Sequence, residues 1–286
     1  MKPQCPVCDA EMDAERTPWL LHCRRCGLLG SKLSEEIPDA RSRVAIDEAA
    51  RAEGLNALRE RNFRTIVGLL GKLREQRGRL LDVGCAHGWF LREAASRGWT
   101  VVGIEPDPGI ARVASRNGAE IRNGTFPDSL KPGERFDVIT FNDVFEHLAD
   151  LNGALRACDG ALNPRGLLAI NLPDARGALY RLASLLASVG LRRPLERLWQ
   201  KGFPSPHLTY FTAPLLRRLA ARHGFRPVYS GHLPSVAWRG LWSRLRYDRR
   251  STVAGAALAW AATSALLPAL RALPSDISLE IFEKPS

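Results

Sequence analysis

One stretch of the chain, residues 79–106, constrains the fold more than any other. It holds a short apolar run that ends at Val83, a glycine loop from Gly84 to Gly88, a segment with helical spacing of its apolar residues, and a second apolar run that leads to Glu105. In this order, strand, glycine loop, helix, strand and acid form the first βαβ unit of a nucleotide-binding parallel sheet. An acid about 20 residues beyond the first glycine is at the usual distance for a carboxylate that accepts hydrogen bonds from ribose hydroxyls. We therefore expect an α/β sheet with a nucleotide-type ligand at the end of its first strand.

The glycine loop limits which nucleotide can bind. No lysine followed by serine or threonine comes after it, which excludes a phosphate-binding P-loop, and its glycines are spaced G-x-x-x-G, which suits a dinucleotide poorly. A ligand with a ribose but no pyrophosphate fits better. The segments LLDVGCAHGWF and GIEPDP resemble motif I and the following acidic loop of class I S-adenosylmethionine-dependent methyltransferases. The alternative is an ordinary α/β turn followed by a surface glutamate.

The resemblance implies a Rossmann-like α/β fold with a seven-stranded, mostly parallel sheet, helices on both of its faces, and S-adenosyl-L-methionine as the cofactor. Further along, FDVITFNDVFEHL resembles motif II with the "EHL" signature of the small-molecule branch, and LNPRGLLAINLPD resembles motif III, with a turn at residues 163–166. In relatives the loop after the third strand contacts adenine, often through an aspartate. This chain offers Thr125 there, and Phe126 could pack against the base. The residues that match cofactor-binding positions are Asp82, Gly84, Ala86, Gly88, Glu105, Thr125, Phe126 and Asn142.

The first 30 residues carry two C-x-x-C pairs, Cys5 with Cys8 and Cys23 with Cys26. Four thiolates with this spacing can converge tetrahedrally on one Zn²⁺, and a site closed by four cysteines is structural rather than catalytic. Because so short a segment cannot bury a core, the metal would supply most of its folding free energy. The gap between the pairs is slightly shorter than is usual for zinc sites, and a redox pair or free thiols are the alternatives. We expect a small zinc-binding module at residues 1–30, with a strand at 19–21.

Other segments flank the expected sheet domain, which covers residues 78–286. Residues 31–44 look like a polar linker, and residues 47–77 look like a helix that either covers the cofactor cleft, as in relatives, or packs on the sheet. Residues 177–205 interrupt the βα pattern with one or two amphipathic helices, which form either a substrate lid or a layer packed on the sheet. The segment HLTYFT resembles the one after motif III in sugar, quinone and lipid-linked-substrate methyltransferases, and its Thr212 can cap the next helix.

A long insertion, residues 234–276, separates the expected sixth strand from the last one, which begins at Ile277. Residues 251–270 carry no charge and are long enough to span a bilayer. Against a span, the run is alanine-rich, Pro268 interrupts its end, and Ile277 must return to the same sheet. The run could instead form a buried or lid helix, or a helix on the membrane surface. Tryptophans and arginines just before the run favour the surface, so we expect any peripheral membrane contact to involve residues 234–273.

Methyl transfer from a sulfonium is an in-line displacement, so the protein mainly has to align the reactants. A hydroxyl acceptor also benefits from a general base with a pKa near the working pH, which favours histidine. The candidates are His147, which follows the motif II strand, and His207, which we expect to face the same cleft, with Glu146 and Tyr210 as partners. The alternatives are that His147 only hydrogen-bonds its loop and that His207 only caps a helix or holds the lid.

The sequence thus predicts an enzyme that O-methylates a small or lipid-linked molecule, such as a sugar or quinone hydroxyl. An RNA methyltransferase is the second hypothesis, because a net charge of +11 and a zinc module could grip phosphates. Against it, no Asn-Pro-Pro-Tyr-type motif follows the fourth strand. A scaffold that retains the cofactor fold without catalysis is the third. Six cysteines, four of them in the metal pattern, and no visible secretory signal predict a cytoplasmic protein, at most peripheral to the inner face of the membrane.

Overall fold

The computed structural model describes residues 2–15, 17–34, 48–116, 118–235, 240–246 and 252–286. Residues 35–47, which include most of the linker expected at 31–44, lie outside these ranges, as do residues 236–239 and 247–251 of the long insertion. All seven expected strands and the lid insertion lie within them, as does the zinc module apart from residues 1 and 16.

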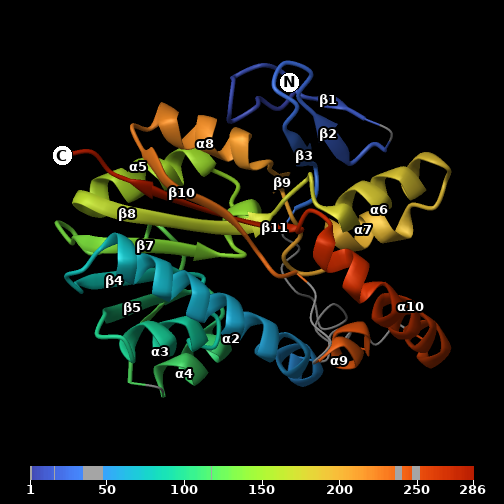
Figure 1. The fold of residues 1–286 in the computed structure, drawn as a ribbon. Helices are drawn as coiled ribbons and strands as arrows, with labels where there is room; N and C mark the ends of the chain where they lie inside the picture. The colour runs from blue at the N-terminus through green and yellow to red at the C-terminus, as the bar shows by residue number, and fades with distance from the viewer. Residues whose placement is uncertain (1, 16, 35–47, 117, 236–239, 247–251) are drawn as a thin grey trace.

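The centre of the molecule is a seven-stranded sheet in the order β10-β11-β8-β7-β4-β5-β6 (Figure 1). Neighbouring pairs among β8, β7, β4, β5 and β6 are parallel, whereas β11 runs antiparallel to both β10 and β8. This confirms the predicted Rossmann-like sheet. The strands are β4 (Arg79–Val83), β5 (Thr100–Glu105), β6 (Glu120–Asn123), β7 (Phe136–Asn142), β8 (Leu162–Pro173), β10 (Arg226–Leu233) and β11 (Ile277–Glu283).

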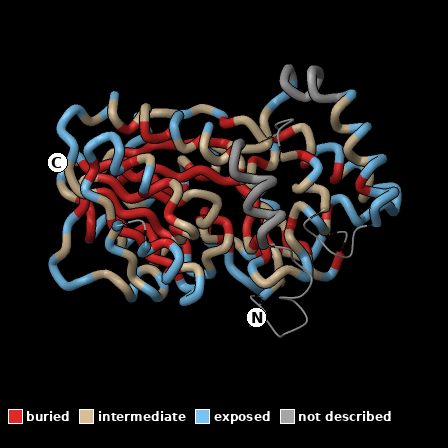
Figure 2. The backbone as a smooth tube through the Cα atoms, turned by 90° about the horizontal axis from the view of Figure 1, so that it is seen from below, coloured by how far each residue is buried: buried red, intermediate tan, exposed pale blue. Residues whose placement is uncertain are grey.

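Helices cover both faces of the sheet (Figure 1). One face carries α2 (Glu48–Leu73), α3 (Trp89–Ala95) and α4 (Pro108–Ser115), and the other carries α5 (Leu151–Ala161) and α8 (Ala213–Arg222). An apolar cluster fills the space on each side, and Figure 2 shows that the buried backbone is concentrated in the strands between the helices. Burial of this apolar surface is the main force that holds the layers together.

Two local expectations differ from the structure. Residues 163–166, expected as a turn, lie within β8, where the pairing with β7 shifts register and Arg165 has a φ of +57°. The backbone turns locally there, but the strand continues on both sides as a bulge. Thr212 does occupy the N-cap position of α8, but its side chain makes no capping hydrogen bond.

The N-terminal module forms a second, four-stranded sheet. Its strands are β1 (Asp13–Ala14), β2 (Leu20–His22) and β3 (Leu29–Ser31), and β2 contains two of the three residues expected as a strand. The fourth strand, β9 (Thr209–Tyr210), comes from the segment that follows the lid insertion and pairs antiparallel with β3. The module is therefore joined to the methyltransferase-like part through backbone hydrogen bonds.

The two insertions are helical, as expected. The first holds α6 (Ala178–Ser188) and α7 (Arg193–Leu198), and the second holds α9 (Leu241–Arg246) and α10 (Val253–Ala272). α9 packs between α2 and α10. Of the described side chains in the first half of α10, only Ala256 is buried, while Val253 and Leu258 are exposed, so α10 is not a core helix. Among the described residues, no helix combines the length and apolarity needed to cross a bilayer.

Candidate functional site

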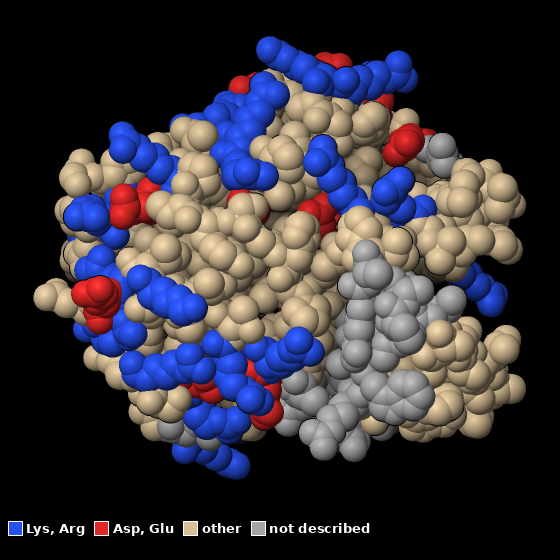
Figure 3. All heavy atoms as spheres, viewed as in Figure 1, with Lys and Arg blue, Asp and Glu red and all other residues tan. Residues whose placement is uncertain are grey.

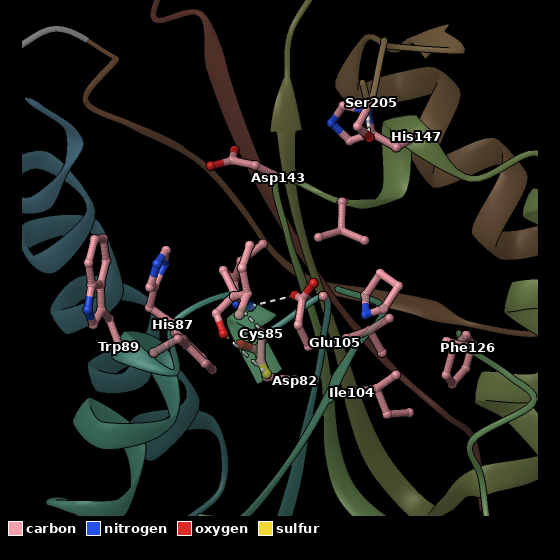
Figure 4. Close-up of a pocket in the computed structure, with 18 of the residues that line it drawn as sticks. Asp82, Cys85, His87, Trp89, Ile104, Glu105, Phe126, Asp143, His147 and Ser205 are labelled. Atoms are coloured by element: carbon pink, nitrogen blue, oxygen red, sulfur yellow. Dashed lines mark hydrogen bonds between the residues drawn. The ribbon is translucent and has the colours of Figure 1, made fainter. Parts of the chain in front are cut away.

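A cavity of about 390 Å³ opens at the carboxyl ends of β4, β5 and β7. This is the position where open parallel sheets bind their ligands, and the volume is in the range of small-molecule sites. In Figure 4, Glu105 lies in the middle of the cavity, with His87 and Trp89 to one side and Phe126 to the other. His147 and Ser205 lie together on a separate part of the wall. The cavity thus has two ends, which we name after the roles expected from the sequence. The cofactor end is lined by Glu105, His87, Trp89 and Phe126, and the acceptor end by His147 and Ser205 (Figure 4).

The glycine loop after β4 can approach a ligand closely because its backbone adopts left-handed conformations. Gly84 and Gly88 have φ values of +67° and +74°, and Ala86 has a φ of +46°. A Cβ on Gly84 would lie 2.6 Å from Cγ2 of Val144, so a larger residue cannot fit without movement. Gly88 is the N-cap of α3, and the loop therefore leads directly into the helix N-terminus.

Glu105 ends β5 and holds the glycine loop in place. Its Oε2 accepts a hydrogen bond from the Ala86 N–H at 2.9 Å, and its Oε1 accepts one from the Asp107 N–H at 3.0 Å. Each carboxylate oxygen keeps a second lone pair, which is what two vicinal ribose hydroxyls require. Burial raises the pKa of Glu105, and the two backbone donors act against that shift.

Asp82 lies deeper, at the end of β4. Its Oδ1 accepts hydrogen bonds from Oγ1 of Thr140 at 2.7 Å and from Nδ2 of Asn142 at 2.8 Å. Burial raises the pKa of Asp82 to about 7, although both hydrogen bonds favour the charged form. Asn142 therefore both lines the cavity and fixes the orientation of Asp82.

The loop after β6 lines the cavity through Thr125 and Phe126. Oγ1 of Thr125 donates to Oδ2 of Asp128 at 2.8 Å. The aspartate of this loop therefore contacts the threonine but does not itself line the cavity. Phe126 packs edge-on against Phe141, with ring centroids 5.5 Å apart. Seven of the eight residues expected to bind the cofactor therefore line one cavity. The eighth, Gly88, lies at the end of the glycine loop.

Several further residues line the cavity that were not expected as site residues from the sequence, although His87 and Trp89 lie within the segment that resembles motif I. Arg59 and Phe63 reach the cavity from α2, while Ile66 and Leu70 of the same helix are buried against the sheet. α2 therefore both packs on the sheet and covers the cleft. His87 and Trp89 form a stacked pair, with ring centroids 5.3 Å apart and an interplanar angle of 19°. Gln200 and Ser205 come from the loop after α7.

His147 lies at the acceptor end, in the 3₁₀ turn Phe145–His147 that follows β7. Its Nδ1 is 2.8 Å from the Pro206 carbonyl oxygen, which can only accept, so Nδ1 carries the proton. The other ring nitrogen, Nε2, is therefore the one that can take up a proton. His147 thus combines a place on the cavity wall with a hydrogen bond that orients its ring and leaves Nε2 as the nitrogen without that bond.

His207 does not line the cavity, which corrects the expectation that it faces the cleft. It is 5% exposed and lies behind His147, with the two ring centroids 4.8 Å apart. The pairing of β9 with β3 turns this part of the chain inward, so the ring packs against Tyr210 and its Nε2 lies 2.9 Å from Nε2 of Gln200. Burial lowers the pKa of His207 well below its usual value.

Glu146 is fully buried between the two histidines. Its Oε1 is 3.9 Å from Nε2 of each imidazole, and neither carboxyl oxygen has a hydrogen-bond partner among the described residues. Burial, followed by the charge of Asp143, raises the pKa of Glu146 well above its usual value. One carboxylate and two imidazoles are also a ligand set that a divalent cation accepts, and their ligand atoms lie within 4.8 Å of one another.

The four cysteines of the N-terminal module converge as predicted. Sγ of Cys5 lies 3.5 Å from Sγ of Cys26, and Sγ of Cys8 lies 3.4 Å from Sγ of Cys23. All four sulfur atoms lie within 4.8 Å of one another, so they could bind one Zn²⁺. None of these four residues lines the cavity, and a site closed by four thiolates offers no open position for a substrate, which is typical of a structural metal.

A family model for the methyltransferase domain matches residues 55–230, more than half of the chain. The protein belongs to the class I S-adenosylmethionine-dependent methyltransferases. Among solved structures, a methyltransferase of Haloferax volcanii in complex with the Trm112 methyltransferase activator is similar, with a TM-score of 0.57 and 16% sequence identity. The match covers 84% of this chain and 95% of that one, and at this identity it shows the fold alone.

Curated relatives of this methyltransferase include the ubiquinone biosynthesis O-methyltransferases of two bacteria. The protein of Azorhizobium caulinodans is 34% identical over 120 residues, which are 40% of this chain and 47% of that protein. The protein of Cereibacter sphaeroides is 42% identical over 96 residues, which are 32% of this chain and 39% of that protein. The chain therefore matches about half or less of the length of these relatives.

Proposed function

We propose that this methyltransferase transfers a methyl group from S-adenosylmethionine to the hydroxyl of a small molecule of the quinone-precursor type. The observation that carries this proposal is His147, an imidazole on the cavity wall at the acceptor end whose Nδ1–H donates to the Pro206 carbonyl. The names of the related ubiquinone O-methyltransferases support an aromatic hydroxyl as the acceptor. A phenolic hydroxyl is acidic enough for an imidazole to deprotonate it within the site.

When bound, S-adenosylmethionine supplies an electrophilic methyl group on sulfur. Glu105 would accept hydrogen bonds from the ribose hydroxyls, the glycine loop would approach the cofactor through its backbone, and Phe126 would pack against the base. Nε2 of His147 would take the hydroxyl proton as the new O–CH₃ bond forms and the S–CH₃ bond breaks. The transfer would leave the methyl group on the oxygen, the proton on His147 and neutral S-adenosylhomocysteine as the product.

His207 and Glu146 have a different role in this proposal, because neither lines the cavity. We assign them as positioning residues that hold His147 from behind. The 3.9 Å separations from Glu146 Oε1 to both imidazoles define a compact polar cluster under the acceptor end. In this proposal the edge-on packing of His207 against the His147 ring orients that ring without touching the substrate.

The test is methyl transfer from radiolabelled S-adenosylmethionine to a catechol-type quinone precursor with a short side chain, with transfer RNA and ribosomal RNA as competing acceptors. We expect label in the phenolic fraction and loss of transfer in Glu105→Ala. Label in RNA instead would support the second hypothesis. Cofactor binding by calorimetry without transfer to either acceptor class would contradict the proposal and favour the scaffold hypothesis.

A second part of the proposal concerns a lipid-linked acceptor. Large apolar side chains on and directly after α6, and on α10, are exposed, among them Leu185 at 64%, Val189 at 72% and Leu258 at 73%. The start of α6 adjoins the end of α10, where the Ala178 N–H donates to the Pro274 carbonyl at 3.1 Å. In Figure 3 this end of the molecule shows few charged side chains, whereas Lys and Arg gather over the N-terminal module and near α2.

We propose that this apolar end rests on an anionic membrane surface. Exposed arginines of the same insertion, Arg181, Arg192 and Arg193, could approach lipid phosphates while the apolar side chains enter the interface. We expect co-sedimentation with phosphatidylglycerol vesicles but not with phosphatidylcholine vesicles, and about a fivefold weaker association for Leu185→Glu. Val113→Glu is the matched control, because Val113 is an exposed apolar residue of α4, away from α6 and α10. Equal binding of all three proteins would contradict the proposal.

A further inference from the structure

One loop, residues 199–207, supplies part of the acceptor end of the cavity, and we call it the lid loop. Gln200 and Ser205 line the cavity, and the Pro206 carbonyl accepts the hydrogen bond that fixes the His147 tautomer. The loop is closed at its base, because the His207 N–H donates to the Trp199 carbonyl at 3.1 Å. The position of Trp199 and His207, where the loop closes, therefore decides where its cavity-lining residues lie.

The N-terminal module holds the His207 end of the lid loop. Oγ of Ser31 donates to the His207 carbonyl at 2.9 Å, and the Ser31 N–H donates to the Leu208 carbonyl at 2.9 Å. β3 and β9 continue this pairing in antiparallel register, with Gly30 opposite Thr209. On the far side, the Leu208 N–H donates to the Glu146 carbonyl at 2.9 Å, so this segment lies between the module and the turn that carries His147.

The module also holds the Trp199 end. Trp19 packs edge-on against Trp199, with ring centroids 5.7 Å apart, and Nζ of Lys201 lies 5.6 Å from the Trp19 ring centre. Leu20 of the module is buried in the same apolar cluster as Tyr180 of α6 and Leu195 of α7. Both ends of the lid loop therefore contact the N-terminal module, and helices α6 and α7 share an apolar cluster with it.

The described part of the module contributes no lining residue to the cofactor end, although Val7 and Leu28 share a buried apolar cluster with Val83 and Ile104. None of the described residues that line the cavity comes from the module, and Asp82, Gly84 and Glu105 belong to strands and loops of the central sheet. Loss of the Trp19 and Ser31 contacts alone would thus displace the lid loop and leave the cofactor residues in place. This asymmetry gives the module a function that a nucleic-acid-binding appendage would not have.

We propose that the N-terminal module is a structural part of the acceptor site, and that Trp19 and Ser31 position the lid loop that surrounds His147. The four-cysteine cluster fits this role, because the zinc it could bind would hold β2 and β3 in the geometry that both contacts need. The inference rests on the proposed function, since it assigns the module to the acceptor of that same reaction.

The test compares four full-length proteins: wild type, Trp19→Ala, Trp19→Phe and Arg24→Ala. Trp19→Ala removes the contact with Trp199, and Trp19→Phe keeps an aromatic ring there. Arg24→Ala removes a module side chain that is 82% exposed and serves as the matched control. Zinc content, S-adenosylhomocysteine affinity by calorimetry, hydrogen exchange of the amides in residues 199–207, and catechol methylation are measured for each.

We expect Trp19→Ala to keep its zinc and to bind S-adenosylhomocysteine within about twofold of wild type, while the lid-loop amides exchange about tenfold faster. Its kcat/KM for the catechol should fall about tenfold, with recovery in Trp19→Phe and no change in Arg24→Ala. Ser31→Ala removes only the side-chain bond to the His207 carbonyl and should shift exchange in the same direction by a smaller factor. It serves as the decisive variant if Trp19→Ala does not fold.

Unchanged exchange of the lid loop in a folded Trp19→Ala or Ser31→Ala protein would overturn the inference, as would equal losses of cofactor and acceptor binding. The exchange and calorimetric measurements need no methyl acceptor. If wild type methylates no catechol, the proposed function fails, yet these two measurements still decide whether the module positions the lid loop.

Discussion

The two ends of the cavity are built in different ways. The core of the cofactor end, from Asp82 to Glu105, comes from one βαβ unit, and most of its ligand-facing groups are backbone atoms or side chains at strand ends. The acceptor end is assembled from the turn after β7, the lid loop and the N-terminal module that holds this loop. In the proposed function, cofactor binding therefore rests mainly on one local unit, whereas acceptor binding depends on segments that meet only in the folded chain. The following predictions test whether a substitution at one end of the cavity leaves the function of the other end unchanged.

The largest expected effect is at the acceptor end. His147→Ala should lower kcat for the catechol by about 10² to 10³-fold, because the hydroxyl proton loses its acceptor. The affinity for S-adenosylhomocysteine should stay within about twofold, because His147 lies at the other end of the cavity. Stopped assays and calorimetry measure the two quantities.

The matched control for His147 is His223→Ala, since Nε2 of His223 pairs with Oδ1 of Asn152 at 2.8 Å, on the α5 and α8 side of the sheet. The control should keep wild-type kcat. A His147→Ala protein that loses cofactor affinity as much as it loses kcat would show that the two ends are not separable.

A smaller effect, on cofactor affinity and not on the acceptor KM, is expected at the cofactor end. Glu105→Gln should weaken cofactor binding by about 10 to 100-fold, because the ribose hydroxyls lose a charged acceptor. The acceptor KM at saturating cofactor should stay near that of wild type. Glu120→Gln is the control, because Glu120 pairs with Arg122 and Lys131 at the outer strand β6. Unchanged cofactor affinity in Glu105→Gln would argue against Glu105 as the ribose ligand.

The smallest effect is a pH dependence of stability without ligand. The pKa of Asp82 is about 7 in the folded protein, above the value of about 4 for an unfolded aspartate. The folded state therefore binds this proton more tightly, and the stabilisation is complete below pH 4 and is lost as the pH rises through 7. Asp82→Asn can keep both hydrogen bonds, because Thr140 and Asn142 donate to the same oxygen.

We expect the free energy of unfolding of wild type, minus that of Asp82→Asn, to fall between pH 5 and pH 8 in urea titrations without cofactor. The subtraction removes the contributions of the thiolates and of the other carboxyl groups, which the two proteins share. A difference that is flat or rises with pH would show that burial does not dominate at Asp82.

Local patterns were sufficient for the cofactor end. G-x-x-x-G, the acid at Glu105 and the apolar runs on either side predicted the βαβ unit, because strands, tight turns and helix starts depend on residues close in sequence. The cysteine pairs likewise predicted a metal module, since tetrahedral coordination needs only short spacings. Gln200 and Ser205 carried no such signal, and the turn expected at residues 163–166 became a bulge because β8 pairs on both sides.

His207 shows most clearly what the sequence by itself determined and what only the tertiary structure decided. Its type and its place after the lid insertion were readable, and they suggested a base in the cleft. The pairing of β9 with β3 instead buries the ring behind His147, and it leaves Pro206 to fix the His147 tautomer. Strand pairing between segments so far apart in the chain depends on the whole fold. The sequence therefore determined the sheet, the cofactor loop and the cysteine cluster, while long-range packing decided that His147, and not His207, lines the cavity.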